Sequence, residues 1–342
     1  MKNLFDLSAY DYELPKALIA SHPLQNRDES RLMIVDRQAV QISEIKFCEL
    51  ADFLDSGDQL ILNDTRVIKA RLFGAKETGA HIEIFLVKKI ADSTWEVMAR
   101  PGRKLKMGDT VTIGPDFSCQ IVKTLGSGNK VVRFTFEGDF MELLDSYGQM
   151  PLPHYMERGA EVCDDERYQT VYGKKSGALA APTAGLHFTP ELFSKLAKKG
   201  IDSQMVTLHV GLGTFKPVQV DDIREHHMHA ESYFLNERTA DKINAPHKRK
   251  ICVGTTTCRV LETCSDKQGK VKPGSGETDI FIYPGYQFQC VKHLLTNFHL
   301  PGSSLIMLVC AFGGYELMME AYRKAVEQKF RFYSYGDAML IL

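Results

Sequence analysis

Residues 60–66, LILNDTR, show a pattern that recurs along this chain: an apolar, strand-like run ends abruptly in small and polar residues. The same change occurs where 178–181 runs into 182–188, 205–210 into 211–215, and 251–253 into 254–257. In open α/β sheets, ligands bind at the carboxyl ends of strands, because the loops there can vary while the sheet holds them rigid. Four such strand ends predict one shared site.

Helix and strand patterns alternate in the second half of the chain. Thr189 as N-cap and Pro190 in the first turn begin a predicted helix, which positive charge and Gly200 close. Strands are predicted at 205–210, 250–253 and 278–283, and helices at 259–263 and 317–328. This alternation is typical of an α/β domain.

The region from about 66 to 136 has a different pattern, with a period of two and frequent Gly and Pro residues. It predicts short strands at 67–73, 81–89, 94–99, 110–113, 119–125 and 130–136, followed by a helix at 140–147. Short strands at this spacing indicate a small antiparallel barrel or sandwich. We therefore predict a large α/β domain with a mixed sheet or barrel, formed by residues 1–65 and 150–342. A small antiparallel β-barrel domain at residues 66–149 interrupts it.

Length and composition suit a two-domain globular protein of 342 residues. No apolar window approaches a membrane helix and the N-terminus has no apolar signal core, so we expect a cytoplasmic protein. The eight cysteines form no C-x-x-C pair. The net charge of −1 argues against a protein that coats nucleic acid, but local basic clusters such as 174–175 could bind a phosphate backbone.

Three histidines, His187, His209 and His299, each follow a strand or turn and have Gly, Pro or Thr nearby. A lone histidine on an apolar segment is usually a hydrogen-bonded core residue. Three in similar contexts favour at least one that titrates in a cleft.

A second pair, His226 and His229, has the spacing of two zinc ligands on one helix face, but no third ligand is visible nearby. A metal-dependent hydrolase that uses this pair is one alternative function, and a substrate-facing or structural pair is the other interpretation. A non-catalytic RNA-binding protein is a second alternative. A purely RNA-binding function would not require the Thr-, Gly- and His-rich strand ends.

Longer motifs lie along nearly the whole chain. They include LNDTRVIKARL at 62–72, APTAGLHFT at 181–189, TLHVGLGTFKPV at 207–218, VGTTTCRVLE at 253–262, TNFHLPGSSLIMLV at 296–309 and FYSYGDAMLI at 332–341. In these segments the chain resembles the S-adenosylmethionine:tRNA ribosyltransferase-isomerase family of queuosine biosynthesis.

The resemblance implies a reaction that composition and spacing do not show. The ribosyl part of S-adenosylmethionine is transferred to the 7-aminomethyl-7-deazaguanine (preQ1) base at the wobble position of tRNA and isomerised, giving epoxyqueuosine, and adenine and methionine leave. S-adenosylmethionine is then a consumed cosubstrate. No recycled cofactor and no metal are implied. The partners are S-adenosylmethionine and the tRNA anticodon loop, with no membrane, and the protein is expected to be a monomer.

This chemistry requires bases for the incoming amine and for the proton beside the sulfonium, and a hydrogen-bond donor or acid for the departing adenine. His187 or His209 is the predicted base, and the other predicted catalytic groups are Asp64, Glu277 and Asp279. A turn ion pair is the alternative for Asp64 with Arg66, and exposed edge charges are the alternative for the other two carboxylates.

For the substrate, Arg66 and the backbone amides of 211–214 are assigned to the methionyl carboxylate. The predicted substrate-binding set is Arg66, Thr183, Gly185, Gly211, Gly213, Thr214, Thr255, Thr256, His226, His229, Tyr283, Asn297 and His299.

For tRNA, an unpaired base has to stack on a ring while cations hold phosphates. The predicted tRNA-binding residues are Tyr155, Tyr168, Tyr172 and Tyr286 for stacking, and Arg100, Arg103, Lys174 and Lys175 for phosphates. Packing at a domain edge is the alternative for each tyrosine.

Overall fold

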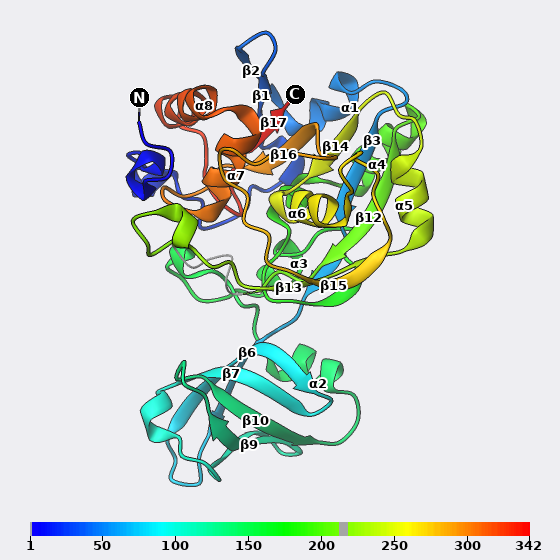
Figure 1. Ribbon diagram of the computed structural model, residues 1–342. Helices are drawn as coiled ribbons and strands as arrows, with labels where there is room; N and C mark the ends of the chain where they lie inside the picture. Colours follow the sequence, from blue (N-terminus) through cyan, green and yellow to red (C-terminus); the bar gives the residue numbers. More distant parts are fainter. Residues whose placement is uncertain (1, 212–217) are drawn as a thin grey trace. The chain divides into compact units, whose positions relative to one another are not determined.

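The computed structural model describes residues 2–211 and 218–342 of the chain. The described residues form two compact units (Figure 1). The larger unit contains the residues up to Arg66, Pro153–Arg158 and Gln169–Leu342, and the smaller unit contains Val67–Leu152 and Gly159–Tyr168. Residues 150–152 and 159–168, which the sequence analysis assigns to the large domain, therefore group with the smaller unit, and Arg66, which it assigns to the barrel domain, groups with the larger unit.

The larger unit alternates strands and helices. Its strands are β1 (Arg31–Asp36), β2 (Gln41–Lys46), β3 (Gln59–Asn63), β4 (Thr65–Val67), β11 (Lys175–Ala178), β12 (Asp202–Leu208), β13 (Glu231–Leu235), β14 (Lys250–Val253), β15 (Gly274–Thr278), β16 (His293–Asn297) and β17 (Ala338–Ile341); the last residue of β4 is the first of the smaller unit. Its α-helices are α1 (Leu50–Phe53), α4 (Pro190–Lys198), α5 (Glu237–Asn244), α6 (Thr255–Cys264), α7 (Ser304–Gly313) and α8 (Tyr315–Glu327). Its short 3-10 helices include η4 (Phe47–Glu49), η6 (His154–Met156), η7 (Thr183–His187) and η9 (Ile223–Glu225).

Within the described residues, nine strands form one mixed sheet in the order β15-β13-β12-β3-β14-β16-β17-β1-β2. Strands β12, β3, β14 and β16 run parallel to one another. The pairs β16–β17, β1–β2, β12–β13 and β13–β15 are antiparallel, whereas β1 and β17 are parallel. The carboxyl ends of the four central parallel strands therefore lie at the same edge of the sheet. The predicted α/β class with a mixed sheet is confirmed.

Alternate residues of the central strands face two separate hydrophobic cores. Ile61 of β3 and Cys252 of β14 belong to the core that includes α5, α6, α7 and α8. Their neighbours Leu62 and Val253 belong to the core that includes α1 and α4. Because both faces of the sheet are covered, residues 60–62 of β3 and 251–253 of β14 are continuous apolar runs and do not alternate with polar residues.

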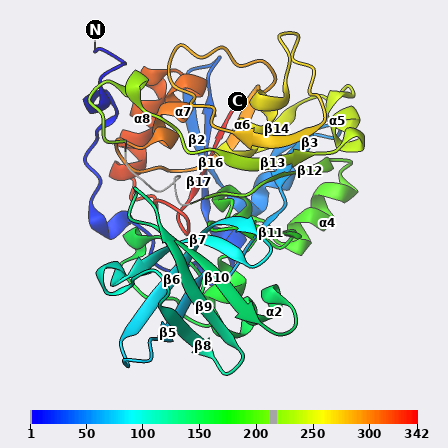
Figure 2. The same ribbon diagram turned by 60° about the horizontal axis from the view of Figure 1, so that its bottom comes forward.

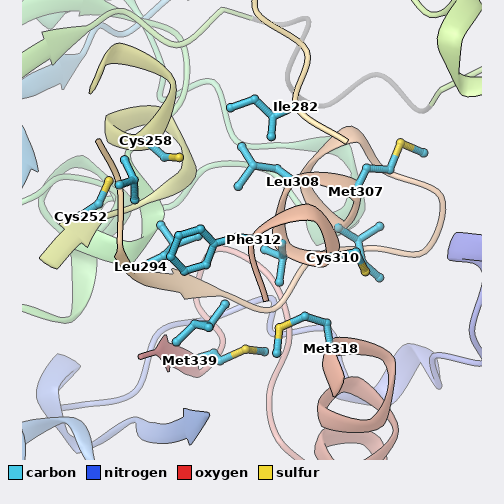
Figure 3. Close-up of a cluster of buried hydrophobic side chains, with 14 of the residues drawn as sticks. Cys252, Cys258, Ile282, Leu294, Met307, Leu308, Cys310, Phe312, Met318 and Met339 are labelled. Atoms are coloured by element: carbon cyan, nitrogen blue, oxygen red, sulfur yellow. The ribbon is translucent and has the colours of Figure 1, made fainter. Parts of the chain in front are cut away.

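The core on the α6, α7 and α8 side is rich in sulfur. Figure 3 shows Cys258 of α6, Cys310 of α7 and Met318 of α8 together with Leu294 and Phe312. Methionine and buried cysteine fill irregular gaps between helices, because their side chains are apolar and adaptable. All eight cysteines are free thiols.

The smaller unit contains a closed barrel with the strand order β10-β7-β6-β5-β8-β9 (Figure 2). Its elements are β5 (Arg71–Ala75), β6 (His81–Ala91), β7 (Thr94–Arg100), β8 (Thr110–Gly114), β9 (Phe117–Thr124), β10 (Lys130–Phe136), α2 (Phe140–Tyr147) and α3 (Asp164–Arg167). Helix α2 places the Phe140 ring against the rings of Trp95 and Phe134. The predicted small antiparallel β-barrel is confirmed.

One predicted strand, at 278–283, is wrong in its bounds, because β15 ends at Thr278. Beyond that point the Arg259 guanidinium takes the backbone groups that a strand would use: its Nη2 donates to Thr278 O (3.2 Å) and its Nε to Ile280 O (3.3 Å). These two carbonyls therefore accept from a side chain of α6 and not from the backbone of a neighbouring strand.

No single helix in the described part of the chain is long and apolar enough to cross a membrane; α7 and α8 meet the length and composition only as a pair bent by 119°.

Candidate active site

A pocket lies beside the carboxyl ends of β14 and β16, at the edge where the sequence analysis expects a ligand. Its empty volume is about 540 Å³, including the open space at its mouth. The described residues that line it belong to the larger unit: Ala180, Ala181, Pro182, Thr183, Ala184, Val210, Gly254, Thr255, Thr256, Thr296, Asn297, Phe298, His299, Leu305, Tyr333 and Ser334.

Two predicted threonines, Thr255 and Thr256, line the pocket from the first turn of α6. Gly254 has a φ of +91°, which side-chain-bearing residues rarely adopt, so glycine permits the sharp passage from β14 into α6. Asn63, at the end of β3, donates from Nδ2 to Leu208 O (2.9 Å) and to Thr256 Oγ1 (3.5 Å). The end of β3 thus links the end of β12 to the first turn of α6.

His299 also lines the pocket and is held on several sides. Its Nε2 lies 2.9 Å from Thr296 Oγ1, its N–H donates to the Tyr322 hydroxyl (3.1 Å), and its carbonyl accepts from the Tyr12 hydroxyl (2.5 Å). Burial lowers the pKa of His299 to about 3, so the ring is neutral at physiological pH. The pocket therefore contains an uncharged imidazole in a fixed orientation.

Tyr333 has a φ of +76°, which is rare for an aromatic residue. Backbone contacts hold it there: its N–H donates to Phe298 O (3.1 Å) and its carbonyl accepts from Asn297 Nδ2 (2.9 Å). The hydroxyls of Tyr155 and of the neighbouring Ser334 form a hydrogen bond, and the Tyr155 ring lies 3.8 Å from the Tyr333 ring, centroid to centroid. The η6 segment therefore contacts residues that line the pocket.

His187 lies in η7 but does not line the pocket. It is 3% exposed, its ring stacks on Phe47, and its Nδ1 lies 2.7 Å from Ser30 Oγ. Burial lowers the pKa of His187 to about 4; the Asn297 side chain and the Arg27 backbone oppose this to a smaller extent. This environment is that of a buried neutral histidine behind the pocket wall.

Asp64 and His209 form a second polar cluster, next to the ends of β3 and β12. The Thr207 hydroxyl donates to Asp64 Oδ1 (2.6 Å), and Thr65 Oγ1 lies 2.8 Å from His209 Nδ1. Burial lowers the pKa of His209, and the Asp64 charge acts in the opposite direction. Neither residue lines the pocket, although Val210, the residue after His209, does.

The His209 ring packs directly against the backbone of Gly177, which has no Cβ. A Cβ added to Gly177 would lie 2.9 Å from His209 Cε1. Gly185 has a similar role in η7, because its added Cβ would lie 2.0 Å from the Tyr172 hydroxyl. Gly185 is predicted to contact the substrate. In the structure it permits close packing against Tyr172 behind the pocket.

Several predicted residues lie apart from the pocket lining. Glu277 and Asp279 are exposed, at the end of β15 and just beyond it, and Arg66 is exposed on β4. Tyr283 packs against Phe5 and Phe281. Glu277 belongs to an edge strand, because β15 is the outermost strand on its side of the sheet, and Asp279 follows the end of that strand.

The 211–214 loop is described only at its first residue, where the Gly211 N–H donates to Glu231 Oε1 (2.8 Å). Gly213 and Thr214 lie outside the described residues. The carboxylate of Glu231 already accepts this amide, so Gly211 does not present a free N–H to a ligand.

The tRNA-binding candidates differ in accessibility. Lys174, Lys175, Arg100 and Arg103 are exposed. Tyr168 is wrong as a stacking residue, since it is fully buried in the smaller unit. The Tyr172 hydroxyl is buried against Gly185, and the Tyr286 hydroxyl donates to Glu262 Oε2 (3.1 Å).

Functional candidates that the sequence analysis missed are Thr296, Ser334 and Tyr333. All three come from segments whose motifs are visible in the sequence, TNFH and FYSYG. No local signal predicts the positive φ of Tyr333, because contacts to residues 297 and 298 hold its backbone.

The model of the family described as "queuosine biosynthesis protein" matches residues 7–341. The chain belongs to this family. S-adenosylmethionine:tRNA ribosyltransferase-isomerase from Acetivibrio thermocellus is 50% identical over 98% of this chain and 99% of its own length, and that from Heliobacterium modesticaldum is 51% identical over 98% and 100%. A crystal structure of S-adenosylmethionine tRNA ribosyltransferase from Thermotoga maritima is 38% identical, with a TM-score of 0.55, over 98% of this chain and 100% of that one. The resemblance stated from the motifs is confirmed.

Membership of the queuosine biosynthesis family agrees with neither alternative function. In addition, residues 226–229 are not helical, since η9 ends at Glu225 and His226 is extended. The i, i+3 geometry that made His226 and His229 a candidate zinc pair is therefore absent. The described residues contain no group of three or more His, Cys, Asp or Glu positioned for a metal ion.

Proposed function

We propose that this chain is an S-adenosylmethionine:tRNA ribosyltransferase-isomerase. The observation that carries the proposal is the family match across residues 7–341, together with relatives of that name about 50% identical over almost the whole of both chains. The proposed reaction moves the ribosyl part of S-adenosylmethionine to the preQ1 base of tRNA and isomerises it, with release of adenine and methionine.

The pocket supports this proposal by its place and its lining residues. It lies at the carboxyl edge of parallel strands, where α/β proteins bind ligands. Thr183, Thr255, Thr256, Asn297 and His299 are the proposed substrate contacts within it.

For the base, we prefer His209 to His187. The attacking amine resembles a lysine ammonium and costs about 4 kcal/mol to deprotonate near neutrality. His209 is only half-buried and lies beside Asp64, which stabilises the protonated ring. His187 is sealed behind the pocket wall, so it is the weaker candidate for direct proton transfer.

Replacement of each histidine tests the assignment. In His209→Asn, single-turnover transfer should fall by roughly 10²–10⁴-fold, the usual contribution of one general base. His187→Asn is the comparison variant, with a smaller fall expected. Unchanged transfer in the His209 variant would remove it from the mechanism.

For tRNA, the exposed lysines Lys174 and Lys175 are proposed to bind phosphates. Their N–H groups donate to Asp64 O (2.8 and 3.1 Å), so this basic segment is fixed next to the Asp64–His209 cluster within the larger unit. Tyr155, next to the pocket-lining Ser334, is the proposed stacking residue.

The decisive experiment incubates the protein with S-adenosylmethionine and tRNA that carries preQ1 and measures free adenine. Adenine should appear only with that tRNA. Matched controls contain the same tRNA with guanine at the wobble position, or no tRNA. Adenine release that is independent of the tRNA would instead indicate a nucleosidase-like activity.

The remaining parts of the proposal concern its setting. We expect a cytoplasmic monomer that uses no recycled cofactor and no metal. Transfer activity should therefore survive treatment with EDTA and gel filtration, and the protein should elute at the size of one 38.5 kDa chain.

A further inference from the structure

The pocket beside β14 and β16 has an uncharged lining within residues 2–211 and 218–342. Its described lining residues are apolar groups, glycine, hydroxyls, one amide and one imidazole, with no Asp, Glu, Lys or Arg. S-adenosylmethionine, in contrast, has an uncharged end, adenine with its ribose, and a charged end, the sulfonium with the methionyl zwitterion. Burying an unpaired charge costs far more than burying a neutral polar group that is hydrogen-bonded. The lining therefore discriminates between the two ends of the ligand.

One polar atom of His299 faces this cavity. Nε2 is engaged by Thr296 Oγ1 at 2.9 Å. Nδ1 contacts no polar group among the described residues, and it is not sealed from solvent. Because His299 is only 6% exposed and lines the pocket, the accessible nitrogen is directed into it.

The position of this nitrogen is fixed by two tyrosines from distant parts of the chain. The Tyr12 hydroxyl donates to the His299 carbonyl, and the Tyr322 hydroxyl of α8 accepts from its N–H. The backbone is thereby held on both sides, while Thr296 holds the ring. A nitrogen held in this way suits directional recognition of a ligand hydrogen-bonding group.

The other walls of the pocket suit a flat ring. Pro182, Val210, Phe298 and Leu305 provide apolar surface, and Asn297 with Ser334 provides neutral polar groups. Small-molecule sites commonly combine apolar walls with a few fixed polar atoms in this way. A heteroaromatic base, with apolar faces and a hydrogen-bonding edge, is complementary to such a lining.

We propose that this pocket is the subsite for the adenine base and its ribose, with His299 Nδ1 as the specific hydrogen-bonding partner of the base. The charged methionyl end lies outside it. This inference rests on the proposed use of S-adenosylmethionine and specifies which part of that molecule the pocket holds. It also separates base recognition from the Asp64–His209 cluster, to which the proton transfers are assigned.

Adenosine and methionine, the two halves of the ligand, test the inference by isothermal titration of the whole protein. Two variants form a matched pair. His299→Asn places an amide near the position of Nδ1, and His299→Gln places one near Nε2. Loss of one directional hydrogen bond of about 1.4 kcal/mol corresponds to a tenfold weaker affinity.

The wild type should bind adenosine, and a saturating concentration of methionine should leave that affinity within twofold. His299→Gln should weaken adenosine binding about tenfold, and His299→Asn should retain most of it. Equal adenosine affinity in all three proteins, no adenosine binding at millimolar concentration, or competition by methionine would each overturn the inference. Thermal unfolding of both variants within a few degrees of the wild type shows that the comparison concerns folded protein.

The adenine-release assay separates this inference from the proposed function. Wild-type protein that releases adenine with preQ1-tRNA, but whose adenosine affinity does not depend on residue 299, leaves the function standing and removes the subsite. Protein that binds adenosine through His299 and releases no adenine removes the function and leaves the subsite.

Discussion

Two buried histidines, His187 and His299, have pKa values lowered by burial to about 4 and about 3. In the unfolded chain a histidine has a pKa of about 6.5. Between pH 6.5 and 4 the unfolded chain therefore binds protons that the folded chain excludes. The free energy of unfolding should be fully retained above pH 6.5 and should fall as the pH is lowered through this window, by about 1.4 kcal/mol per pH unit for each histidine.

Urea unfolding at pH 7, 6, 5 and 4.5 measures this dependence. His187→Asn removes one titrating ring but keeps an amide near the position that contacts Ser30. In this variant, the free energy of unfolding should fall less steeply with decreasing pH, and the difference in slope should be the contribution of one histidine. An unchanged slope would show that the imidazole of His187 is not buried as a neutral group.

Gly185 illustrates how one missing Cβ shapes the site. An added Cβ would lie 2.0 Å from the Tyr172 hydroxyl and 2.9 Å from Thr170 Cγ2. Overpacking of this kind costs about 1–3 kcal/mol, so Gly185→Ala should lower the free energy of unfolding by that amount. Tyr172→Phe in the same chain should recover part of the loss, because the hydroxyl oxygen is the nearest atom.

Gly102→Ala is the control for this prediction, since a Cβ there meets nothing within 4 Å and the backbone φ is ordinary. Its unfolding should be close to that of the wild type. If Gly185→Ala were equally harmless, η7 would have to shift away from Tyr172 at little cost.

Helix α6 is joined to the edge strands by a buried ion pair. Arg259 of α6 pairs with Glu231 of β13 and also donates to the carbonyls of Thr278 and Ile280. Arg259→Met leaves the Glu231 carboxylate buried without its cation, and the expected loss of unfolding free energy is about 3–5 kcal/mol.

Urea unfolding of the single variants and of Arg259→Met with Glu231→Gln tests this arrangement. The double variant should lose less unfolding free energy than the two single variants lose together, because it no longer contains an uncompensated buried charge. Simple additivity would indicate that the two side chains do not act as a pair. Because Glu231 also accepts the Gly211 N–H, loss of this ion pair should also disturb the backbone at Gly211.

Across the whole chain, charge is nearly balanced, with a net value of −1. Affinity for tRNA must then come from local basic clusters, and it should fall steeply with salt. Lys174→Ala with Lys175→Ala should reduce the slope of log K against log salt by about 1.4–1.8, which corresponds to two lost phosphate contacts. Filter binding between 50 and about 200 mM salt measures the slope.

Lys267→Ala with Lys270→Ala is the matched control. These exposed lysines follow the C-terminal end of α6, whereas the pocket lies at its N-terminal end. The control should keep the wild-type slope. The corresponding pair Arg100→Ala with Arg103→Ala reports separately on the barrel unit, and equal slopes in all variants would contradict a phosphate-dominated interaction.

The elements themselves were largely predictable from local sequence. Thr189 caps α4 by accepting from the Leu192 N–H (3.0 Å), as its place before Pro190 predicts. The barrel strands follow the period-two pattern. The strands β1, β2 and β17 were not predicted. The hairpin of β1 and β2 joins the sheet through the pairing of β1 with β17, which lies about 300 residues away in the sequence, as in Leu32 with Ala338.

The sequence alone determined the α/β class, the inserted barrel and the strand ends that carry polar residues, because burial periodicity, capping and turn chemistry are local properties. The family followed from the resemblance of the longer motifs, which the family match confirms. Only the tertiary structure decided which of those residues share a cavity. The strand order β12-β3-β14-β16 brings Thr255 and His299 to one pocket, and leaves His187 behind its wall and Glu277 on an edge strand. The physical reason is that strand pairing and side-chain packing are long-range, so no local pattern specifies them.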